Sequence, residues 1–306
     1  MHAEFQAVID RIGTVLLGKE ATVKLAVTCL LARGHLLIED LPGMGKTTLA
    51  HALARVFDLE YGRIQFTSDL LPADILGVSS FDANDSSFQF HPGPIFNQLI
   101  LADEINRTTP KTQSALLEAM EERQVTVEGD TRTLPTPFFV IATQNPTDQA
   151  GTFPLPESQL DRFLMRVSIG YPDQDAERAL MEGEDRRAML STLEVAMPVD
   201  QLMGHQQAIS DVHAADALLD YIQRIVRFSR ESGLFSVGLS PRGTLSLLTC
   251  ARSWAYVEGR SHVVPEDVQA VMPAVVGHRL HEAADAAGSA DGGAVHRILN
   301  EVDVIG

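Results

Sequence analysis

A glycine-rich segment decides the fold of this chain: Asp40-Leu41-Pro42-Gly43-Met44-Gly45-Lys46-Thr47-Thr48. The apolar run His35-Leu36-Leu37-Ile38-Glu39 precedes it, and the residues that follow, up to Phe57, carry apolar side chains at helical spacing. A strand, a glycine loop and a helix that opens on Lys-Thr form the context that a phosphate-binding loop needs. The sequence therefore predicts a nucleoside triphosphate site at residues 40–48. A chance glycine-rich turn between a strand and a helix is the alternative.

The residue types in this loop suit phosphate chemistry. Gly43 and Gly45 let the backbone curl, so that several N–H groups and the positive end of the following helix can hold phosphate oxygens. Lys46 is expected to reach the β- and γ-phosphates, and the Thr47 hydroxyl to bind Mg²⁺. Asp40 stands where the general pattern has its first glycine. Because aspartate tolerates a left-handed backbone better than most residues, we expect the turn to form there too.

The composition is that of an acidic globular protein. The 306 residues are 45% hydrophobic and carry a formal net charge of −17. This length allows one large domain or two ordinary ones, and the hydrophobic fraction is sufficient for a packed core. An acidic surface repels nucleic-acid phosphates, which need a basic footprint. The charge argues against nucleic-acid binding but leaves room for a buried basic pore.

The cysteines and the start of the chain favour a soluble cytoplasmic protein. Cys29 and Cys250 lie in apolar helical stretches, which favours buried small hydrophobes over a redox role. The first residues, Met1 to Phe5, do not form a basic region followed by an apolar one, so they do not resemble a signal peptide. No stretch is long and apolar enough to span a bilayer.

Apolar periodicity predicts an α/β region followed by a helical one. Up to residue 171, short apolar runs alternate with stretches of helical spacing. The expected strands are 35–39, 63–66, 97–104, 138–143 and the end of 160–169, and the expected helices are 4–17, 20–32, 48–57 and 110–123. Buried strands that alternate with helices predict a parallel sheet flanked by helices over residues 1–171.

The remainder, residues 172–306, is predicted to form a smaller all-helical domain. Helical periodicity covers 173–190, 215–232, 240–257 and 265–280. Ser240-Pro241 suits a helix start, with a serine cap and proline at the first helical position. Residues 283–293 are small and expected to be flexible.

Two segments of the first domain are expected to depart from the strand–helix alternation. Residues 67–94 are predicted to form a helix followed by a hairpin or loop. Residues 124–134 are predicted to form a hairpin with a short turn at Gly129-Asp130.

Polar residues follow two of the expected buried strands. Asp103 and Glu104 end the strand at 97–104, at the edge where ligand sites of open α/β sheets lie. Asp103 is expected to hold Mg²⁺, directly or through water, and Glu104 to polarise the attacking water. Asn145 ends the next strand, where an amide could orient the water or touch the γ-phosphate. The alternatives are a solvated acidic turn and an ordinary loop residue before Pro146.

Two arginines with apolar neighbours also suit phosphate binding. They are Arg162, in Leu160-Asp161-Arg162-Phe163, and Arg242, in Ser240-Pro241-Arg242-Gly243. A guanidinium fork matches phosphate oxygens and can stabilise transition-state charge. Arg242 is expected in the first turn of its helix, where a cation opposes the helix dipole, so an anionic partner is expected there. An ordinary salt bridge is the alternative for each arginine.

Taken together, these motifs resemble the MoxR type of AAA+ ATPase over nearly the whole chain. The resemblance rests on Leu-Ile-Glu-Asp-Leu-Pro-Gly-Met-Gly-Lys-Thr (37–47), Leu-Ala-Asp-Glu-Ile-Asn-Arg (101–107), Lys-Thr-Gln-Ser-Ala-Leu-Leu-Glu-Ala-Met-Glu-Glu-Arg-Gln-Val-Thr (111–126), Ala-Thr-Gln-Asn-Pro (142–146), Leu-Pro-Glu-Ser-Gln-Leu-Asp-Arg-Phe (155–163), Ser-Pro-Arg (240–242) and His-Arg-Leu (278–280). An acid at position 40 departs from the general phosphate loop but is common in this family.

The resemblance implies an AAA+ P-loop core followed by a helical lid, with ATP and Mg²⁺ as cofactors. It assigns Asp40–Thr47 as Walker A, Asp103 and Glu104 as Walker B, Asn145 as sensor 1, Arg162 as the arginine finger and Arg242 as sensor 2. Segment 67–94 is similar to the family's helix-2 insert, and Val125–Leu134 to its hairpin before sensor 1. The family forms hexameric rings that remodel or activate protein clients, often with a partner bearing a von Willebrand factor A domain and sometimes to insert a metal cofactor.

The resemblance thus predicts ATP hydrolysis coupled to the remodelling of a protein client. The rival function is a nucleic-acid motor, since helicase relatives share the insert and the hairpin. The acidic balance and the single basic residue of the hairpin, Arg132, count against it. A GTP switch is disfavoured, because no Asn-Lys-x-Asp stretch follows the core. The sequence assigns no role to His278-Arg279.

Overall fold

A parallel sheet organises the first half of the molecule. The structure, a computed structural model, describes residues 2–82, 87–145, 151–183, 186–282 and 293–305. The sheet has five strands in the order β2-β5-β8-β1-β9, and every neighbouring pair is parallel. The strands are β1 (Leu36–Glu39), β2 (Tyr61–Gln65), β5 (Leu99–Asp103), β8 (Phe139–Gln144) and β9 (Met165–Val167). The prediction of a parallel sheet is confirmed.

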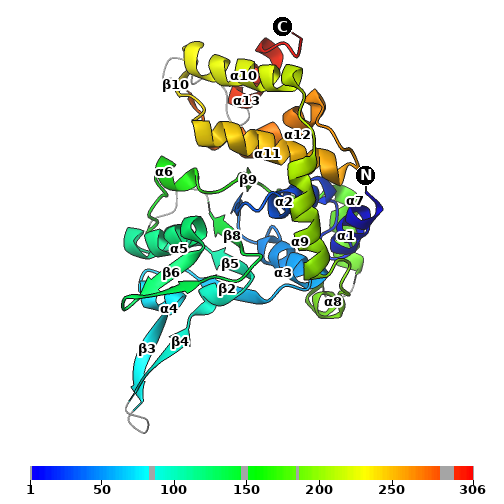
Figure 1. Ribbon diagram of the computed structural model, residues 1–306. Coiled ribbons are helices and arrows are strands. Elements are labelled where there is room, and N and C mark those ends of the chain that lie inside the picture. The colour runs from blue at the N-terminus through cyan, green and yellow to red at the C-terminus, as the bar shows by residue number, and fades with distance from the viewer. Residues whose placement is uncertain (1, 83–86, 146–150, 184–185, 283–292, 306) are drawn as a thin grey trace.

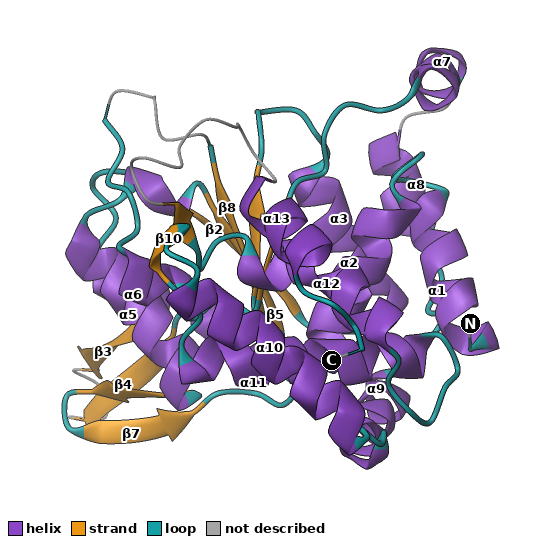
Figure 2. Cartoon of the chain, turned by 90° about the horizontal axis from the view of Figure 1, so that it is seen from above, coloured by secondary structure: helices purple, strands orange, loops and turns teal. Residues whose placement is uncertain are grey.

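Helices cover both faces of this sheet (Figures 1 and 2). Successive side chains of a strand point to opposite faces, so Leu36 and Ile38 join one apolar cluster and Leu37 joins the other. The first cluster contains α1 (Ala3–Gly13), α2 (Glu20–Leu31) and α3 (Lys46–Val56), and the second contains α4 (Pro72–Leu76) and α5 (Pro110–Glu122). A short helix, α6 (Glu157–Leu160), leads into β9.

Two hairpins extend from the α4–α5 side. Strands β3 (Gly77–Asp82) and β4 (Ser87–Pro92) form the arm that projects from the body in Figure 1. Strands β6 (Gln124–Val127) and β7 (Asp130–Thr133) form the second hairpin. The helix-then-hairpin prediction for 67–94 and the hairpin prediction for 124–134 are therefore confirmed. The predicted turn at Gly129-Asp130 is wrong by one residue, because Val127 pairs with Asp130 and the turn is Glu128-Gly129. The two hairpins are linked, because the Arg132 guanidinium lies 3.9 Å from the centre of the Phe90 ring.

In the part of residues 172–306 that the structure describes, the chain is almost wholly helical, with one small antiparallel sheet. Its helices are α7 (Gln174–Glu182), α8 (Arg186–Thr192), α9 (Val199–Ala208), α10 (Asp216–Glu231), α11 (Pro241–Val257), α12 (Pro265–Val276) and α13 (Gly293–Glu301). Strands β10 (Phe235–Val237) and β11 (His281–Glu282) pair with each other. Ser240 caps α11 as predicted, since its hydroxyl accepts a hydrogen bond from the Gly243 N–H at 3.0 Å.

The structure corrects two helix predictions in this region. The single helix predicted at 173–190 is two helices, because Gly183 ends α7 with an extended backbone. The helix predicted to reach residue 280 ends at Val276, just before Gly277. Helices α9 and α13 and the β10–β11 pair were not predicted. The segment predicted to be flexible, 283–293, lies outside the described residues up to position 292.

The helical region is joined to the sheet region by a common apolar core. Helix α11 packs on α2, and the apolar cluster on the α1–α3 face of the sheet continues into α10, α11 and α12. Cys29 and Cys250 are both buried in this cluster, as predicted. Buried polar contacts reinforce it: the Ser253 hydroxyl donates to the Thr28 carbonyl at 2.9 Å. Among the described residues, no helix has the length and apolar character needed to cross a bilayer.

Candidate nucleotide-binding and hydrolysis site

A cavity of about 1040 Å³ lies at the carboxyl ends of β1, β5 and β8. The glycine-rich loop forms one wall, and the residues that end β5 and follow β8 form another. Of the residues predicted to act on nucleotide, those that line the cavity are Pro42, Gly43, Gly45, Lys46, Thr47, Thr48, Asp103, Glu104 and Asn145. The fold therefore gathers the loop, the two acids and the amide in one place.

The glycine-rich loop has the backbone that its sequence predicts. Gly43 and Gly45 have φ values of 86° and 94°, a region that side chains disfavour. Helix α3 starts directly after them, at Lys46. The Lys46 ammonium donates to the Asp40 carbonyl at 2.6 Å and to Asn145 Oδ1 at 3.0 Å. Burial lowers the pKa of Lys46, and the charges of Asp40 and the neighbouring acids oppose that shift.

Asp40 acts differently from the expectation based on its backbone. It does not adopt a left-handed conformation, so its tolerance of that conformation is not what allows the turn. Instead its carboxylate ties the loop to the end of β9. Oδ2 accepts hydrogen bonds from the Ser168 hydroxyl at 3.0 Å, the Ile169 N–H at 2.8 Å and the Gly170 N–H at 2.6 Å. Burial works to raise the pKa of Asp40, but these bonds, with one from the Leu41 N–H, outweigh it and lower the pKa.

The Asp103 carboxylate is fixed on both of its oxygens. Oδ1 accepts a hydrogen bond from the Thr143 hydroxyl at 2.7 Å, and Oδ2 accepts one from Arg63 Nη2 at 2.7 Å. Arg63 comes from β2 and Thr143 from β8, the two strands that flank β5 in the sheet. The carboxylate thus has a set orientation at the cavity wall.

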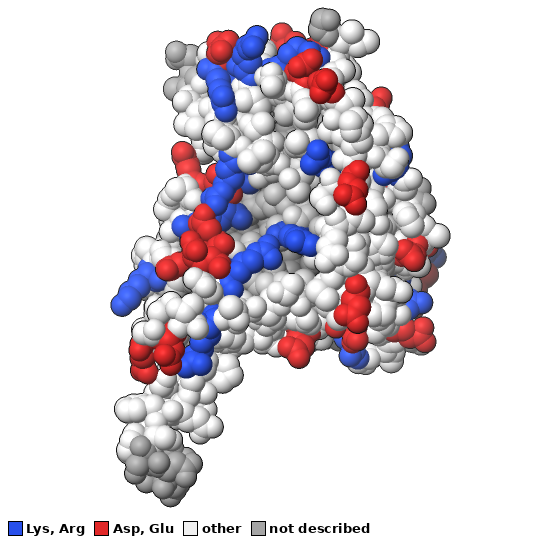
Figure 3. Space-filling view, in the orientation of Figure 1, with Lys and Arg blue, Asp and Glu red and all other residues white. Residues whose placement is uncertain are grey.

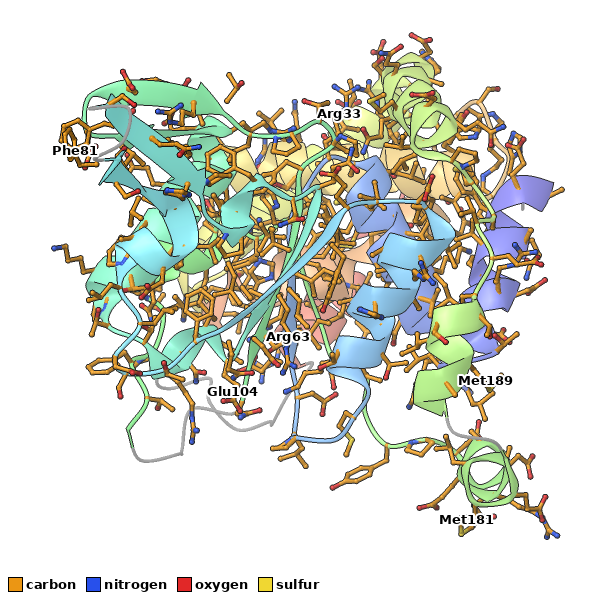
Figure 4. The ribbon with its side chains drawn as sticks, turned by 90° about the horizontal axis from the view of Figure 1, so that it is seen from below. Arg33, Arg63, Phe81, Glu104, Met181 and Met189 are labelled. Carbon is orange, nitrogen blue, oxygen red and sulfur yellow. The ribbon has the colours of Figure 1, made fainter. Side chains whose placement is uncertain are left out.

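Glu104 lies beside Asp103 with a left-handed backbone, at φ 58° and ψ 49°. This conformation is uncommon for a residue with a side chain and costs about 1 kcal/mol or more. The Glu104 N–H donates to the Thr143 hydroxyl oxygen at 2.9 Å, which holds the turn. Oε1 accepts from Asn145 Nδ2 at 3.0 Å, and Oε2 accepts from Gln65 Nε2 at 3.3 Å. Glu104 and Arg63 lie at the same edge of the sheet in Figure 4.

The two predicted arginines lie elsewhere. Arg162 Nε is 3.0 Å from Glu121 Oε2, and Arg242 Nη2 pairs with Glu121 Oε1. Both line a second cavity, of about 540 Å³, together with Gly34 and His35. Those two residues precede β1 whereas the glycine-rich loop follows it, so the two cavities are at opposite ends of this strand.

The body of the sheet separates the two cavities. Strand β1 has four residues and is about 13 Å long. Figure 4 shows Arg33, another residue of the second cavity, at the edge of the molecule opposite to Glu104. The structure therefore does not bring Arg162 or Arg242 to the phosphate loop of the same chain.

Comparison with known proteins assigns the family. The ATPase family associated with various cellular activities (AAA) matches residues 35–165, and the AAA lid domain matches residues 227–300. YeaC of Bacillus subtilis is 42% identical over 99% of this chain and 96% of its own. Chaperone MoxR1 of Mycobacterium tuberculosis is 38% identical over 92% of this chain and 76% of its own. The chain belongs to the MoxR family of AAA ATPases. A crystal structure of a proposed ATPase from Cytophaga hutchinsonii, 34% identical, superposes with a TM-score of 0.87 over 98% of this chain and 94% of its own.

Mg²⁺, the usual companion of nucleotide in the AAA family, is compatible with the oxygen donors of this MoxR cavity. Mg²⁺ prefers oxygen ligands and is commonly bound through one or two carboxylates together with substrate phosphates. The Thr47 hydroxyl and the Asp103 carboxylate line the same cavity. Among the described residues no cluster of three or more His, Cys, Asp or Glu could hold a metal ion by itself. Mg²⁺ at this site would take its other ligands from phosphate oxygens and water.

Several residues that shape this MoxR site were missed by sequence reasoning. Thr143 and Gln65 contact the acids from the ends of β8 and β2. A polar side chain at the end of a predicted strand is the signal that could have found both. Glu121 carries no such signal, because it lies on the exposed last turn of α5 and its two arginine partners are distant in sequence.

Proposed function

We propose that this chain binds ATP in the larger cavity and hydrolyses it to ADP and phosphate. The observation that carries the proposal is the row of hydrogen bonds from Lys46 through Asn145 to Glu104 inside that cavity. Lys46 pairs with the β- and γ-phosphates, and Asn145 fixes the Glu104 carboxylate. Glu104 takes a proton from the attacking water, whose oxygen bonds to the γ-phosphorus as the bond to ADP breaks.

The loop residues 40–48 hold the phosphates through their N–H groups, and the side chains of Thr47 and Asp103 hold Mg²⁺. The ion supplies charge neutralisation at the phosphate oxygens. Thr143 and Arg63 keep Asp103 in the orientation that this needs. Under this proposal, residues 1–171 form the nucleotide-binding core and residues 172–306 form the helical lid.

Two substitutions separate nucleotide binding from hydrolysis. Lys46→Ala removes the cation that pairs with the phosphates, so affinity for a fluorescent ATP analogue is expected to fall at least tenfold. Glu104→Gln keeps the shape of the side chain but cannot accept the proton, so nucleotide binds while hydrolysis falls by about 10²-fold or more. Lys111→Ala and Glu118→Gln, exposed positions on α5, are matched controls. Wild-type hydrolysis by Glu104→Gln would contradict the role of Glu104.

Arg162 and Arg242 act on the ATP of a neighbouring subunit in a hexameric ring. Their separation from the phosphate loop of the same chain supports this arrangement for both arginines. The sensor 2 role that the resemblance assigns to Arg242 then acts across the subunit interface, because a contact from Arg242 to the γ-phosphate of its own chain would have to cross the sheet. An arginine finger supplied by a neighbour contributes on the order of 10³-fold or more in rate.

Subunit mixing tests this arrangement directly. Lys46→Ala supplies intact arginines but an empty site, and Arg162→Ala supplies an intact site without its finger. Each alone is expected to be nearly inactive, whereas mixtures recover activity that depends on the mixing ratio. Mixtures no more active than the separate variants, after co-assembly is shown by native mass spectrometry, would contradict a role in trans.

The client of the hydrolysis cycle is a protein, with an additional partner that bears a von Willebrand factor A domain. Support comes from the relative named Chaperone MoxR1 and from the projecting β3–β4 hairpin. Phe81 and Phe88 on this hairpin are 57% and 74% exposed and lie edge to face, 5.4 Å apart. Exposed aromatic side chains of this kind suit contact with apolar segments of a client. No described feature favours the nucleic-acid alternative.

A further inference from the structure

We propose that Glu121 is a positioning residue that holds Arg162 and Arg242 as one pair for the terminal phosphate on a neighbouring subunit. This inference rests on the proposed action of the two arginines in trans. Glu121 would act through the arginines and would not itself touch the nucleotide.

The Glu121 carboxylate bridges two arginines, one with each of its oxygens. One carboxylate oxygen contacts Arg162 Nε at 3.0 Å, and the other pairs with Arg242 Nη2. Arg162 lies between α6 and β9, whereas Arg242 lies in the first turn of α11. A single side chain from the end of α5 thus brings together one arginine from the core and one from the helical region. Figure 3 shows acidic and basic side chains along the hollow below the helical region on this face.

The net charge of Arg162, Glu121 and Arg242 favours the binding of a further anion. Two guanidinium groups share one carboxylate, so the three side chains carry a net charge of +1. Hydrogen bonding from Arg242 lowers the pKa of Glu121, burial opposes the shift, and the two arginine charges add to it, so the carboxylate is ionised near neutral pH. The side chains of Arg162, Glu121 and Arg242 are 29%, 34% and 47% exposed, and they line an open cavity. A phosphate group arriving from outside would meet both arginines at once.

Buried contacts of Arg279 and His278 already stabilise the segment that carries Arg162, so Glu121 is not needed for its stability. The Arg279 side chain is only 4% exposed and donates to the Asp161 carboxylate at 2.6 Å and to the Phe163 and Leu164 carbonyls at 2.8 and 3.2 Å. His278 adds a bond from its ring to the Phe163 carbonyl at 3.0 Å. These buried contacts fix the segment that carries Arg162. Partly exposed ion pairs such as those of Glu121 add little stability by comparison.

Glu121 preorganises the Arg162 and Arg242 side chains for phosphate binding. Arginine side chains lose rotamer freedom when they bind, and holding them beforehand removes part of that cost. Glu121 keeps both guanidinium groups at one spacing and in one direction before the neighbour's ATP arrives. Without the carboxylate, the two positive charges would repel each other and spread apart.

Glu121→Gln removes the negative charge of the side chain and keeps its size. In Glu121→Gln we expect the KM for ATP to stay within about twofold of wild type, because Glu121 lies outside the nucleotide cavity, while kcat falls about tenfold. Such a loss corresponds to about 1.4 kcal/mol of transition-state stabilisation. Glu121→Asp keeps the charge with a shorter reach and is expected to retain an intermediate kcat. Glu122→Gln removes the adjacent exposed carboxylate and serves as the matched control, with wild-type kinetics expected.

Subunit mixing then assigns Glu121 to the arginine side of the interface. Glu121→Gln mixed with Lys46→Ala is expected to recover activity, whereas Glu121→Gln mixed with Arg162→Ala is not. Wild-type kcat in Glu121→Gln, or recovery in the mixture with Arg162→Ala, would overturn the inference. If Glu121→Gln does not fold, Glu121→Asp carries the same two mixtures with the same expected outcomes.

The outcome separates this inference from the function on which it rests. If Arg162→Ala and Lys46→Ala fail to complement each other, the role in trans is wrong and the role of Glu121 is wrong with it. If they complement each other but Glu121→Gln behaves like Glu122→Gln, only the role of Glu121 is wrong.

Discussion

Asp40→Asn is expected to destabilise the protein, because it removes a charge that four donors share. The carboxylate accepts hydrogen bonds from the N–H groups of Leu41, Ile169 and Gly170 and from the Ser168 hydroxyl. A hydrogen bond to a charged group contributes about 1.5–3 kcal/mol, but the site is only half-buried and water replaces part of the loss. The amide would also point an N–H toward another N–H. We expect a loss of about 3 kcal/mol in the free energy of unfolding, a fall of about 5–10 °C in Tm.

The assay is thermal unfolding of wild type and variant from pH 7 down to pH 3. The pKa of Asp40 is lowered in the folded protein, so its contribution is present above the unfolded value of about 3.9 and is lost as the pH falls through the folded pKa. The difference in Tm is therefore expected to be full at pH 7 and to shrink below about pH 4. Asp220→Asn, at an exposed position on α10, is the control and is expected to leave Tm unchanged.

Asp40→Gly distinguishes a role of the Asp40 carboxylate from a role of the backbone of the turn. It restores the general pattern of the phosphate loop, so a role limited to the backbone of the turn predicts unchanged or increased stability. We expect instead a loss similar to that of Asp40→Asn, because the tie to residues 168–170 is broken. Wild-type Tm in Asp40→Gly would show that the carboxylate contributes nothing.

Three further predictions concern other parts of the molecule. Thr143→Val removes the hydroxyl that joins Asp103 to the Glu104 N–H, so in a steady-state ATPase assay kcat is expected to fall about 10- to 100-fold with ATP affinity within about twofold. Phe88→Ser at an exposed position is expected to weaken binding of an unfolded protein about tenfold, measured by fluorescence anisotropy, and to leave the unstimulated ATPase rate unchanged. Burial lowers the pKa of His35 to about 4. As the pH falls, the unfolded chain therefore protonates this histidine before the folded chain does. His35 is expected to lower the free energy of unfolding by about 3 kcal/mol between pH 6.5 and pH 4. Urea titrations of His35→Gln at several pH values should lack this pH-dependent loss.

The sheet and the nucleotide cavity could be predicted because their signals are local. The apolar runs that became β5 and β8 are continuous, and the acids and the amide come directly after them. Strand ends meet at one edge of a parallel sheet, so placing Asp103, Glu104 and Asn145 together needed only the topology. The left-handed turn at Glu104 and its tie to Thr143 depend on side-chain geometry that spacing does not encode.

The features that were missed depend on distant contacts. Helix α9 has only Leu202 and Gln206 buried and contains Gly204, so its sequence has little amphipathic character. It is held by tertiary contacts such as the bond from Gln206 Nε2 to the Leu30 carbonyl at 2.8 Å. The β10–β11 pair consists of three and two residues, too few to show a period. The role of Glu121 depends on two arginines that are distant in sequence and that only the fold brings to it.

The apolar core that α2 shares with α11 has a mechanical consequence. A protomer whose two regions share one tightly packed interior resists bending between them, since bending would open voids. Such a protomer moves as a stiff lever. Strands β3 and β4 stand farther from the body than any other labelled element in Figure 1, so a small rotation about the nucleotide site would sweep these strands through the widest arc. In the proposed ring, bending would then be confined to the contacts between subunits, and the displacement delivered to the proposed client would grow with the length of the arm.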